Sequence, residues 1–151
     1  MSEPLNVSIR ESETVRVALL EYEDKGLAGT YQGAIGVKFQ EVEGWLRLHG
    51  VKTDGLRRIG VPFTEGEHLR SYWCCIEAPE GVNGDGPVVV RELAGGRYAV
   101  LTIPKNSNLI RESIDRFYGE YVPTHGITID SSRPPLEVYH HDRMEYCIPV
   151  T

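Results

Sequence analysis

Apolar residues along the chain follow two spacings, one typical of strands and the other of helices. Compact or alternating β-rich runs predict strands at residues 15–22, 56–61, 72–78, 88–93, 97–103, 136–140 and 146–150. Two stripes with steps of three and four residues predict amphipathic helices. The first stripe runs from Ile35 to His49 and the second from Ile110 to Tyr121.

Glycine, proline and small polar residues predict where these elements end. Gly50 follows the first stripe at the position where helices usually terminate. Ser107 is a candidate cap for the start of the second helix, and Pro123 predicts that helix's end. The stretches Gly26–Gly33 and Pro79–Pro87 are rich in glycine and other turn residues and predict loops.

Two sequence echoes indicate an internal duplication. The run IRESETVRVALLEY at residues 9–22 resembles VRELAGGRYAVLTI at 90–103, at an offset of 81. The run LRLHGVKTD at 46–54 resembles VPTHGITID at 122–130, at an offset of 76. Two matches in the same order favour duplication over chance. We expect a single domain over residues 1–151, with repeats at about 7–79 and 88–151 joined by the loop 79–87.

Each repeat has the pattern of a hairpin, a helix and two further strands. In the second repeat, Gly95-Gly96 lies between two β-rich runs and predicts the hairpin turn. The predicted fold class is α+β, with tandem pseudo-symmetric strand-helix-strand-strand units, a mostly antiparallel sheet and two main helices. One unit has too little apolar area to stand alone, so we expect a joint interface and a ligand cleft between the halves.

Composition and charge exclude several classes of partner. The chain has 151 residues, of which 40% are hydrophobic and 25% charged, as in soluble globular proteins. No apolar run approaches the roughly 20 residues of a membrane span, and the polar N-terminus lacks the features of a signal peptide. We therefore expect a cytoplasmic protein. A net charge of −6 argues against direct contact with nucleic acid, which requires a concentrated basic face.

Common catalytic and metal-binding patterns are absent from the sequence. It contains no G-x-S-x-G, H-E-x-x-H or P-loop motif. The cysteines Cys74, Cys75 and Cys147 lack zinc-type spacing, and their β-rich context predicts buried thiols. The consecutive side chains of His140–Asp142 would point to opposite faces of a strand, so a solvated turn is the favoured interpretation. We expect no metal, no cofactor and no catalytic residue.

The stretch PPLEVYHHD at residues 134–142 is the most informative. Strand alternation places Leu136 and Val138 on one face, and Glu137 and Tyr139 on the other. A carboxylate beside an aromatic ring in an otherwise apolar strand suits a cationic ligand, because the ligand's charge favours the ionised form that burial disfavours. The alternative is that Glu137 faces solvent on an exposed sheet.

Aromatic side chains are the second candidate feature of a binding site. Their faces attract cations and stack on flat apolar rings. The candidate ligand-binding residues besides Glu137 are Trp73, Tyr139, Tyr118, Phe63 and Tyr22. Phe117 and Tyr121 lie on the helical stripe and are interpreted as core. For these candidate ligand-binding residues, an ordinary packing role in the hydrophobic core is an open alternative.

Three segments carry a family resemblance: VVVRELAGGRYAVLTIPKN, YVPTHGITIDSSRPPLEVYHHD and the closing EYCIPV. With these motifs the chain resembles the GyrI-like small-molecule-binding family, which includes gyrase-inhibitor-like proteins and effector-binding domains of AraC- and MerR-type multidrug regulators. The likeness covers nearly the whole chain and is strongest from Val88 onward. It implies tandem units with a ligand cleft, where Glu137 faces cationic aromatic ligands and Trp73 and Tyr139 stack on them. In one departure, Tyr121 stands where family helices often have tryptophan.

The residues and the resemblance together lead to three functional hypotheses. The first is a stand-alone, non-enzymatic protein that senses or sequesters amphipathic, cationic aromatic compounds and has no DNA-binding domain. The second is hydrolysis of reactive, cyclopropane-type electrophiles, with Glu137 as general acid or base. The third is a gyrase-inhibitor-like module whose partner is a protein, either a topoisomerase or a transcription regulator.

Overall fold

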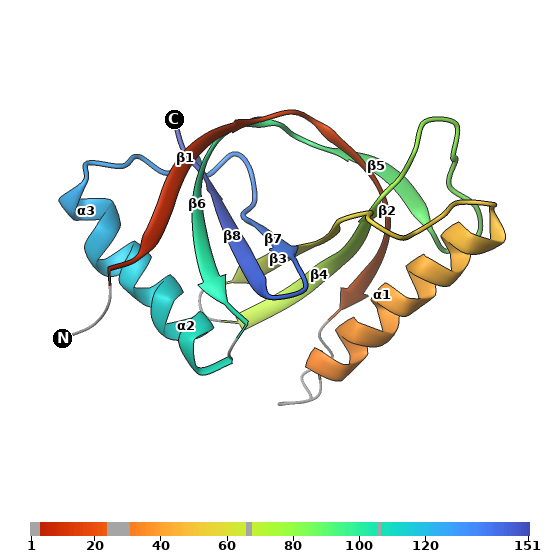
Figure 1. Ribbon diagram of the computed structural model, residues 1–151, viewed down its shortest axis with the longest axis horizontal. Coiled ribbons are helices and arrows are strands. Elements are labelled where there is room, and N and C mark those ends of the chain that lie inside the picture. Colours follow the sequence, from red (N-terminus) through yellow and green to blue (C-terminus); the bar gives the residue numbers. More distant parts are fainter. Residues whose placement is uncertain (1–3, 24–30, 66–67, 106) are drawn as a thin grey trace. The chain divides into compact units, whose positions relative to one another are not determined.

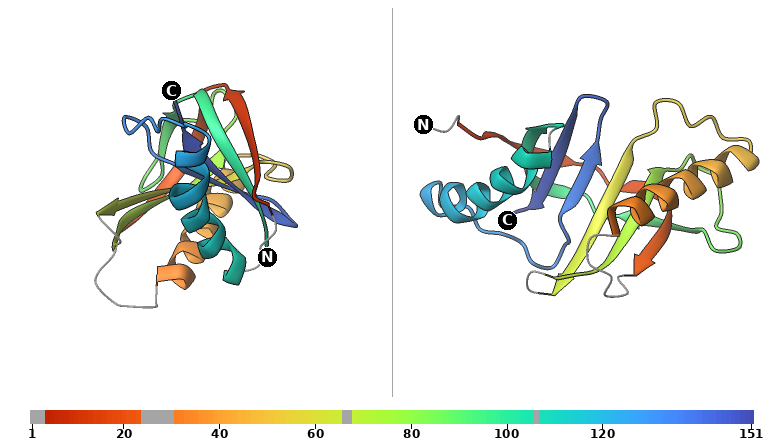
Figure 2. Two further views of the ribbon diagram at one scale, coloured as in Figure 1. Left: turned by 90° about the vertical axis from the view of Figure 1, so that its left-hand side faces the viewer. Right: turned by 90° about the horizontal axis from the view of Figure 1, so that it is seen from below.

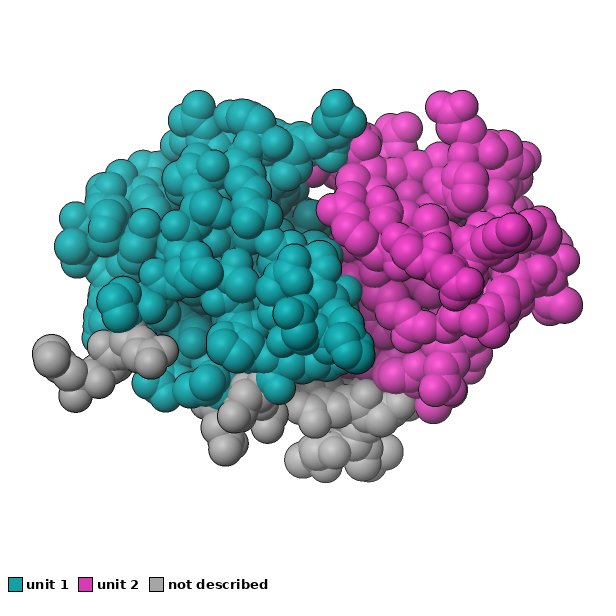
Figure 3. Space-filling model, viewed as in Figure 1, with its two compact units in different colours: residues 1–13, 95–151 teal, residues 14–94 magenta. Residues whose placement is uncertain are grey.

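The structure is a computed structural model that describes residues 4–23, 31–65, 68–105 and 107–151 (Figure 1). The chain forms two compact units, which Figure 3 shows in different colours. Unit 1 comprises residues 1–13 and 95–151, and unit 2 comprises residues 14–94. None of the helices in the described part of the chain is both long enough and apolar enough to cross a membrane.

Unit 2 is a four-stranded antiparallel sheet with one long helix. Its elements are β2 (Val15–Glu23), α1 (Tyr31–Leu48), β3 (Arg58–Glu65), β4 (His68–Glu77) and β5 (Val89–Leu93). The strands pair in the order β3-β4-β2-β5. Helix α1 packs on β2 and β4, as the views in Figures 1 and 2 show. Its predicted apolar stripe is confirmed in Phe39, Val42 and Leu46, which are all buried.

Unit 1 has the same layout. Its elements are β1 (Asn6–Ser12), β6 (Gly96–Pro104), α2 (Ser107–Arg116), η1 (Phe117–Tyr121), α3 (Val122–Thr124), β7 (Leu136–Tyr139) and β8 (Arg143–Pro149). The strands pair in the order β1-β6-β8-β7, and every pair is antiparallel. Helix α2 packs on β6. The order β2-α1-β3-β4 thus recurs as β6-α2-β7-β8, which confirms the predicted strand-helix-strand-strand repeat.

The two helices end in the same way. Gly50 and Gly126 both have positive φ, at 80° and 62°, so each terminates its helix in the left-handed conformation that glycine adopts readily. A histidine precedes each glycine and stacks on an aromatic ring four residues earlier. The ring centroids are 4.0 Å apart for Trp45 with His49 and 3.8 Å for Tyr121 with His125. Tyr121 therefore has the place that tryptophan occupies in the first repeat.

Strand register agrees with the predicted offset between the two repeats. Leu20 pairs with Cys74 across β2 and β4, and Leu101 pairs with Tyr146 across β6 and β8. Because Leu20 and Leu101 match at the predicted offset of 81, Cys74 and Tyr146 hold equivalent positions. Both face a helix. The Cys74 thiol donates a 3.7 Å hydrogen bond to the Ile35 carbonyl of α1, and Tyr146 is buried in one core cluster with Phe117.

The predicted hairpin at Gly95-Gly96 is wrong. Strand β5 pairs with β2, while β6 pairs with β1, so the first strand of each repeat completes the sheet of the other repeat. The glycines serve a different purpose. A Cβ on Gly96, whose φ is +125°, would lie 2.7 Å from Arg133 Nη1, and the Arg133 guanidinium donates a hydrogen bond to the Gly95 carbonyl. These glycines make room for an arginine instead of forming a tight turn.

Some boundaries differ from the predictions. Helix α1 begins at Tyr31, inside the stretch Gly26–Gly33 that predicts a loop, and residues 26–30 lie outside the described part. His49, the last residue of the first predicted stripe, is exposed. The Ser107 side chain, proposed as a helix cap, also lies outside the described residues. The thiols of Cys74 and Cys75 are buried as predicted, whereas Cys147 is half-buried, and burial raises the pKa of the Cys74 thiol to about 12.

The second helix is not regular along its length. After Arg116 it widens into the π-helical turn η1, where the Val122 amide donates a hydrogen bond to the Phe117 carbonyl five residues back. Pro123 follows directly. A proline ring clashes with the carbonyl four residues before it in an α-helix, and it has no N–H to donate. The wider turn therefore accommodates Pro123, and the helix continues to Thr124, close to its predicted end.

Candidate functional site

Glu137 lies on the sheet face of unit 1 that packs against the helical segment. It pairs with Tyr146 across β7 and β8, and directly paired residues of an antiparallel sheet project from the same face. The Tyr139 hydroxyl donates a 3.0 Å hydrogen bond to Glu137 Oε1, which confirms that Glu137 and Tyr139 share this face. Val138 between them is buried on the opposite face. Glu137 itself is half-buried.

Tyr146 adjoins this carboxylate, and Tyr118 in turn adjoins Tyr146. The hydroxyls of Tyr118 and Tyr146 are 3.4 Å apart, and their rings meet edge to face with centroids 6.4 Å apart. Burial raises the pKa of the Tyr146 hydroxyl, and the hydrogen-bonded Tyr118 and the negative charge of Glu137 raise it further. Tyr146 is therefore a neutral phenol. We call Glu137, Tyr139, Tyr146 and Tyr118 the tyrosine–glutamate cluster.

The π-helical turn positions Tyr118 in this cluster. Phe117 is fully buried beneath it, whereas Tyr118 itself is 39% exposed. Residues in a π turn are displaced from the 3.6-residue period, and such turns occur often at functional sites. The predicted apolar stripe of the second helix does not include Tyr118. The sequence signal for the distortion is Pro123, which lies within an otherwise helical pattern.

The equivalent position in unit 2 has no carboxylate. Gly60 pairs with Cys74, just as Glu137 pairs with Tyr146, so Gly60 and Glu137 are counterparts in the two repeats. The space above Gly60 is filled by the ring of Tyr72, whose hydroxyl would lie 1.6 Å from a Cβ on Gly60. The helix-facing carboxylate is thus a feature of the second repeat.

The remaining predicted site residues lie in unit 2 and fall on two faces of its sheet. Trp73 and Phe63 contact each other edge to face, with ring centroids 4.8 Å apart. Tyr22 pairs with Tyr72, which contacts α1 through Phe39, so Tyr22 lies on the helix face. The strand alternation of β4 places Trp73 on the opposite face from Tyr72. The predicted cleft that would unite the residues of the two repeats stays a prediction.

A polar network that the sequence analysis missed lies on the other face of unit 1. Glu145, 9% exposed, accepts a 2.7 Å hydrogen bond from Arg10, and its Oε1 lies 2.6 Å from His140 Nε2. Burial alone raises the pKa of the Glu145 carboxyl. Hydrogen bonds from His140 and Arg10, with the positive charge nearby, outweigh burial and hold that pKa below its ordinary value. The alternation of Met144, Glu145 and Tyr146 is a weak sequence signal for a carboxylate within the sheet. Its partner Arg10 is 135 residues away in the sequence, so the local pattern does not predict the pair.

The Glu145 network predicts acid sensitivity. A carboxyl whose folded-state pKa is lowered stabilises the fold above its unfolded pKa, near 4.5, and loses that contribution as pH falls through the folded value. Glu145→Gln is expected to cost about 1 kcal/mol of unfolding free energy at pH 7. The difference from wild type should shrink when pH drops below about 4.5. Urea unfolding of both proteins at pH 7, 5 and 3.5 measures this; a difference that stays constant with pH contradicts it.

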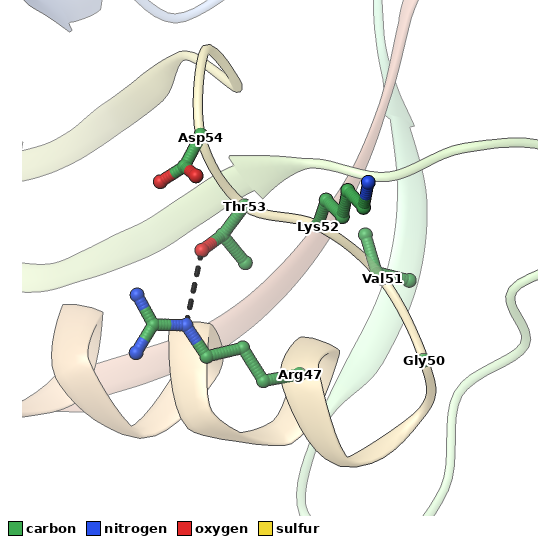
Figure 4. A pocket seen from close by; sticks show the side chains of 6 residues that line it. All are labelled: Arg47, Gly50, Val51, Lys52, Thr53 and Asp54. Atoms are coloured by element: carbon green, nitrogen blue, oxygen red, sulfur yellow. Dashed lines mark hydrogen bonds between the residues drawn. The ribbon is translucent and has the colours of Figure 1, made fainter.

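A hollow with a polar lining lies at the end of α1 (Figure 4). It is lined by Arg47, Gly50, Val51, Lys52, Thr53 and Asp54. Arg47 points toward Thr53 and donates a 3.2 Å hydrogen bond to its hydroxyl, and it also pairs with Glu43 at 2.7 Å. The hollow contains none of the predicted site residues. Among the described residues, no group of three or more histidine, cysteine or acidic side chains is arranged to hold a metal ion.

Comparisons with known proteins identify a family and a fold. The family model described as GyrI-like small molecule binding domain matches residues 5–151. No curated protein sequence matches the chain. The C-terminal domain of EcmrR is similar in structure, with a TM-score of 0.71 and 10% identity over 97% of this chain and 98% of that domain. The chain spans 57% of the EcmrR chain seen in a complex with DNA.

Two further solved structures share the fold. A hydrolase from Listeria innocua has a TM-score of 0.66 and 10% identity, covering 96% of this chain and 91% of its own. SAV2435, solved with bound tetraphenylphosphonium, has a TM-score of 0.56 and 15% identity, covering 97% of this chain and 94% of its own. These identities support a shared fold, while the family match covers nearly the whole sequence.

Proposed function

Because the chain belongs to the GyrI-like family of small-molecule-binding domains, we propose that it binds small amphipathic aromatic cations, with the Glu137 carboxylate as their counter-charge. The observation that carries this proposal is the tyrosine–glutamate cluster. Tyr139 orients the half-buried carboxylate through its 3.0 Å hydrogen bond, and the neutral phenols beside it provide aromatic surfaces. That SAV2435 is solved with a lipophilic phosphonium cation supports the ligand class.

The chemistry of the cluster favours cations over other ligands. A carboxylate in partly apolar surroundings is weakly solvated, and a ligand cation that displaces water restores its electrostatic stabilisation. Aromatic faces add roughly 0.5 to 2 kcal/mol for each well-placed contact with a cation. Within the proposal, Tyr139 and Tyr118 stack on the ligand, and Trp73, Phe63 and Tyr22 of unit 2 remain candidate contacts. The protein then acts as a cytoplasmic sensor or sequestering protein that does not itself contact DNA.

Replacing Glu137 with glutamine tests the counter-charge directly. The variant keeps an acceptor for the Tyr139 hydroxyl but removes the charge, so a fluorescent cationic dye and tetraphenylphosphonium should each bind at least about tenfold more weakly, a loss of about 1.4 kcal/mol. Titration by fluorescence and by calorimetry measures the affinity. Glu112→Gln, which removes an exposed carboxylate from α2 of the same unit, is the matched control and should leave binding unchanged. If a neutral aromatic of similar size binds wild type and Glu137→Gln as the cations do, the charge has no role.

A second candidate function is hydrolysis of reactive electrophiles. The phenol–carboxylate pair of Tyr139 and Glu137 supports it, because a carboxylate held by a hydrogen bond can accept a proton from an attacking water. The similarity to a Listeria innocua hydrolase is consistent with this chemistry. Catalytic turnover of cyclopropane-type substrates that is lost in Glu137→Ala would favour hydrolysis, and binding without turnover across a substrate panel would favour the ligand-binding function.

A further inference from the structure

Strand β1 belongs to the first repeat in sequence but completes the sheet of the second. All seven of its residues pair with β6, beside which it lies in Figure 1. Two ion pairs support this ladder, between Arg10 and Glu145 at 2.7 Å and between Glu11 and Arg97 at 2.9 Å. If the two repeats were separate chains, the same contacts would form an exchange of strands between two molecules.

The attachment of β1 to unit 1 involves little burial. None of its seven residues is buried, and only Val7 and Ser8 are half-buried. Val7 and the preceding Leu5 pack against the core cluster of unit 1. Elements with few buried contacts separate from a fold at low free energy. When β1 leaves, the edge of β6 has unpaired N–H and C=O groups, which are a template for another strand. The vacated edge therefore favours a strand with the sequence of β1.

A short connector joins β1 to β2. It consists of Glu13 and Thr14, and the division between the two units falls between them. Both residues are exposed, so a change of backbone conformation there leaves the buried core intact. Two residues are the commonest length of a β-hairpin loop, but here they join strands that pair with different partners. Short connectors of this kind favour domain swapping, in which a second copy receives the exchanged element.

We propose that the β6 edge binds β1 of a second copy of this chain, and that each copy donates its β1 to the other in a strand-exchanged dimer. Both unit 1 sheets are then complete, and the ion pairs of Arg10 and Glu11 form between chains instead of within one. Because the β1–β6 contacts are the same in monomer and dimer, protein concentration and the conformation of the connector determine the balance. This inference is independent of the proposed function, since it requires no ligand at Glu137.

Reversing the charges of the Glu11–Arg97 pair tests whether β1 is donated between chains. Glu11→Arg and Arg97→Glu each bring like charges together between β1 and β6, in the monomer and in a dimer of identical chains. A strand-exchanged dimer with one chain of each variant has opposite charges at both of its β1–β6 contacts. We mix the variants in urea, remove the urea by dialysis and count dimers by native mass spectrometry. The mixed dimer should be about fivefold more abundant than the dimer of either variant, which exceeds random pairing.

A similarly exposed ion pair in unit 2 provides the matched control. Glu65 and Arg70 are 2.8 Å apart, on β3 and β4. Glu65→Arg and Arg70→Glu change the net charge of each chain as the first two variants do, but they alter no residue of β1 or β6. Their mixture should therefore give no excess of mixed dimer. An equal excess in both mixtures would overturn the proposal, and so would a mixture of Glu11→Arg and Arg97→Glu that contains only monomer.

A synthetic peptide of residues 4–13 tests the same edge in the wild-type protein, and decides the question if circular dichroism shows that a variant fails to fold. The dye-labelled peptide should bind slowly and saturably, because β1 of the protein must first leave β6. Fluorescence polarisation measures this binding, and a peptide with the same residues in scrambled order is the control. Binding no stronger than that of the scrambled peptide would contradict strand donation, since the β6 edge would then not accept a second β1.

Discussion

Replacing Gly60 with alanine is expected to destabilise the protein by about 3 kcal/mol, because the new Cβ would overlap a buried tyrosine ring. The Cβ would lie 1.6 Å from the Tyr72 hydroxyl oxygen and 2.3 Å from Cζ. Tyr72 is 4% exposed and its ring packs edge to face on Phe39 of α1, so it has little room to move. The overlap must be relieved by shifting the helix, the strand or the ring, each within a close-packed interior.

A second substitution identifies the cause of this loss. Tyr72→Leu removes the overlapping atoms, so Gly60→Ala in that background should cost much less than in wild type, and urea unfolding of the four proteins gives the coupling energy. Gly44→Ala on α1 is the control, because a Cβ added there has no atom within 4 Å. Alanine is favoured over glycine in a helix by about 1 kcal/mol, so this variant should not lose stability. An equal loss for Gly60→Ala with and without Tyr72 would contradict the steric explanation.

The steric conflict at Gly60 also accounts for the asymmetry of the two repeats. Gly60 and Glu137 are counterparts, but the adjoining ring is Tyr72 in the first repeat, while β8 has the flexible Met144 at the position equivalent to Tyr72. A glutamate at position 60 has no space beneath the Tyr72 ring. At this pair of counterpart positions only the second repeat has a carboxylate, and the proposed function uses a position where the repeats have diverged.

Local sequence patterns predict the elements of this fold but not which strands pair. Strands β2 to β8, the two main helices and their glycine ends follow from apolar spacing and backbone preference, which are local properties, whereas β1 (Asn6–Ser12) is not among the predicted strands. The exchange of β1 and β5 does not. Arg10 and Glu11 of β1 correspond to Arg91 and Glu92 of β5, so the two strands offer similar side chains to either neighbour. The same echo that reveals the duplication leaves the choice of partner undetermined.

The candidate site was predictable only in part for a similar reason. Alternation along β7 places Glu137 and Tyr139 together correctly, because two residues on one strand are fixed by a period of two. Tyr118 enters through a π turn that the 3.6-residue period does not describe. Glu145 becomes a buried ion-pair partner through Arg10 of the exchanged strand. Local residue spacing does not predict features that depend on contacts between residues distant in the sequence.

Arg133 links several segments of unit 1, and Arg133→Ala is expected to cost about 3 kcal/mol of unfolding free energy. Its guanidinium donates hydrogen bonds to the carbonyls of Gly95, Arg97 and Val150, at 3.1 to 3.2 Å. It also lies 4.7 Å from the centroid of the buried Tyr98 ring. The side chain is 15% exposed, so alanine would leave partly buried carbonyls without their donor.

The position of these carbonyls explains why Arg133→Ala should loosen one part of the sheet as well as lower the global unfolding free energy. Gly95 and Arg97 flank the start of β6, whose edge pairs with the exchanged strand β1, and Val150 lies just beyond β8. Without Arg133 the end of β8 should separate first from β6. Hydrogen exchange at the Val150 amide, which donates to the Arg97 carbonyl at 3.0 Å, should accelerate more than exchange at the centre of β6.

The dependence of unfolding free energy on acidic pH provides an independent check on the Arg133 contacts. Hydrogen bonds from Ser132 and then from Arg133 lower the pKa of the Asp130 carboxyl from 3.8 to about 2. The Asp130 contribution to stability is therefore complete above about pH 3.8 and is lost as pH falls toward 2. In Arg133→Lys the planar forked donor set is absent, and a single ammonium group cannot reproduce the guanidinium's geometry toward three carbonyls, so lysine should recover only part of the lost stability. Arg143→Ala, which removes an arginine whose side chain is 43% exposed from the same unit, should change stability little. A comparable loss there would show that charge, and not the carbonyl contacts, underlies the effect.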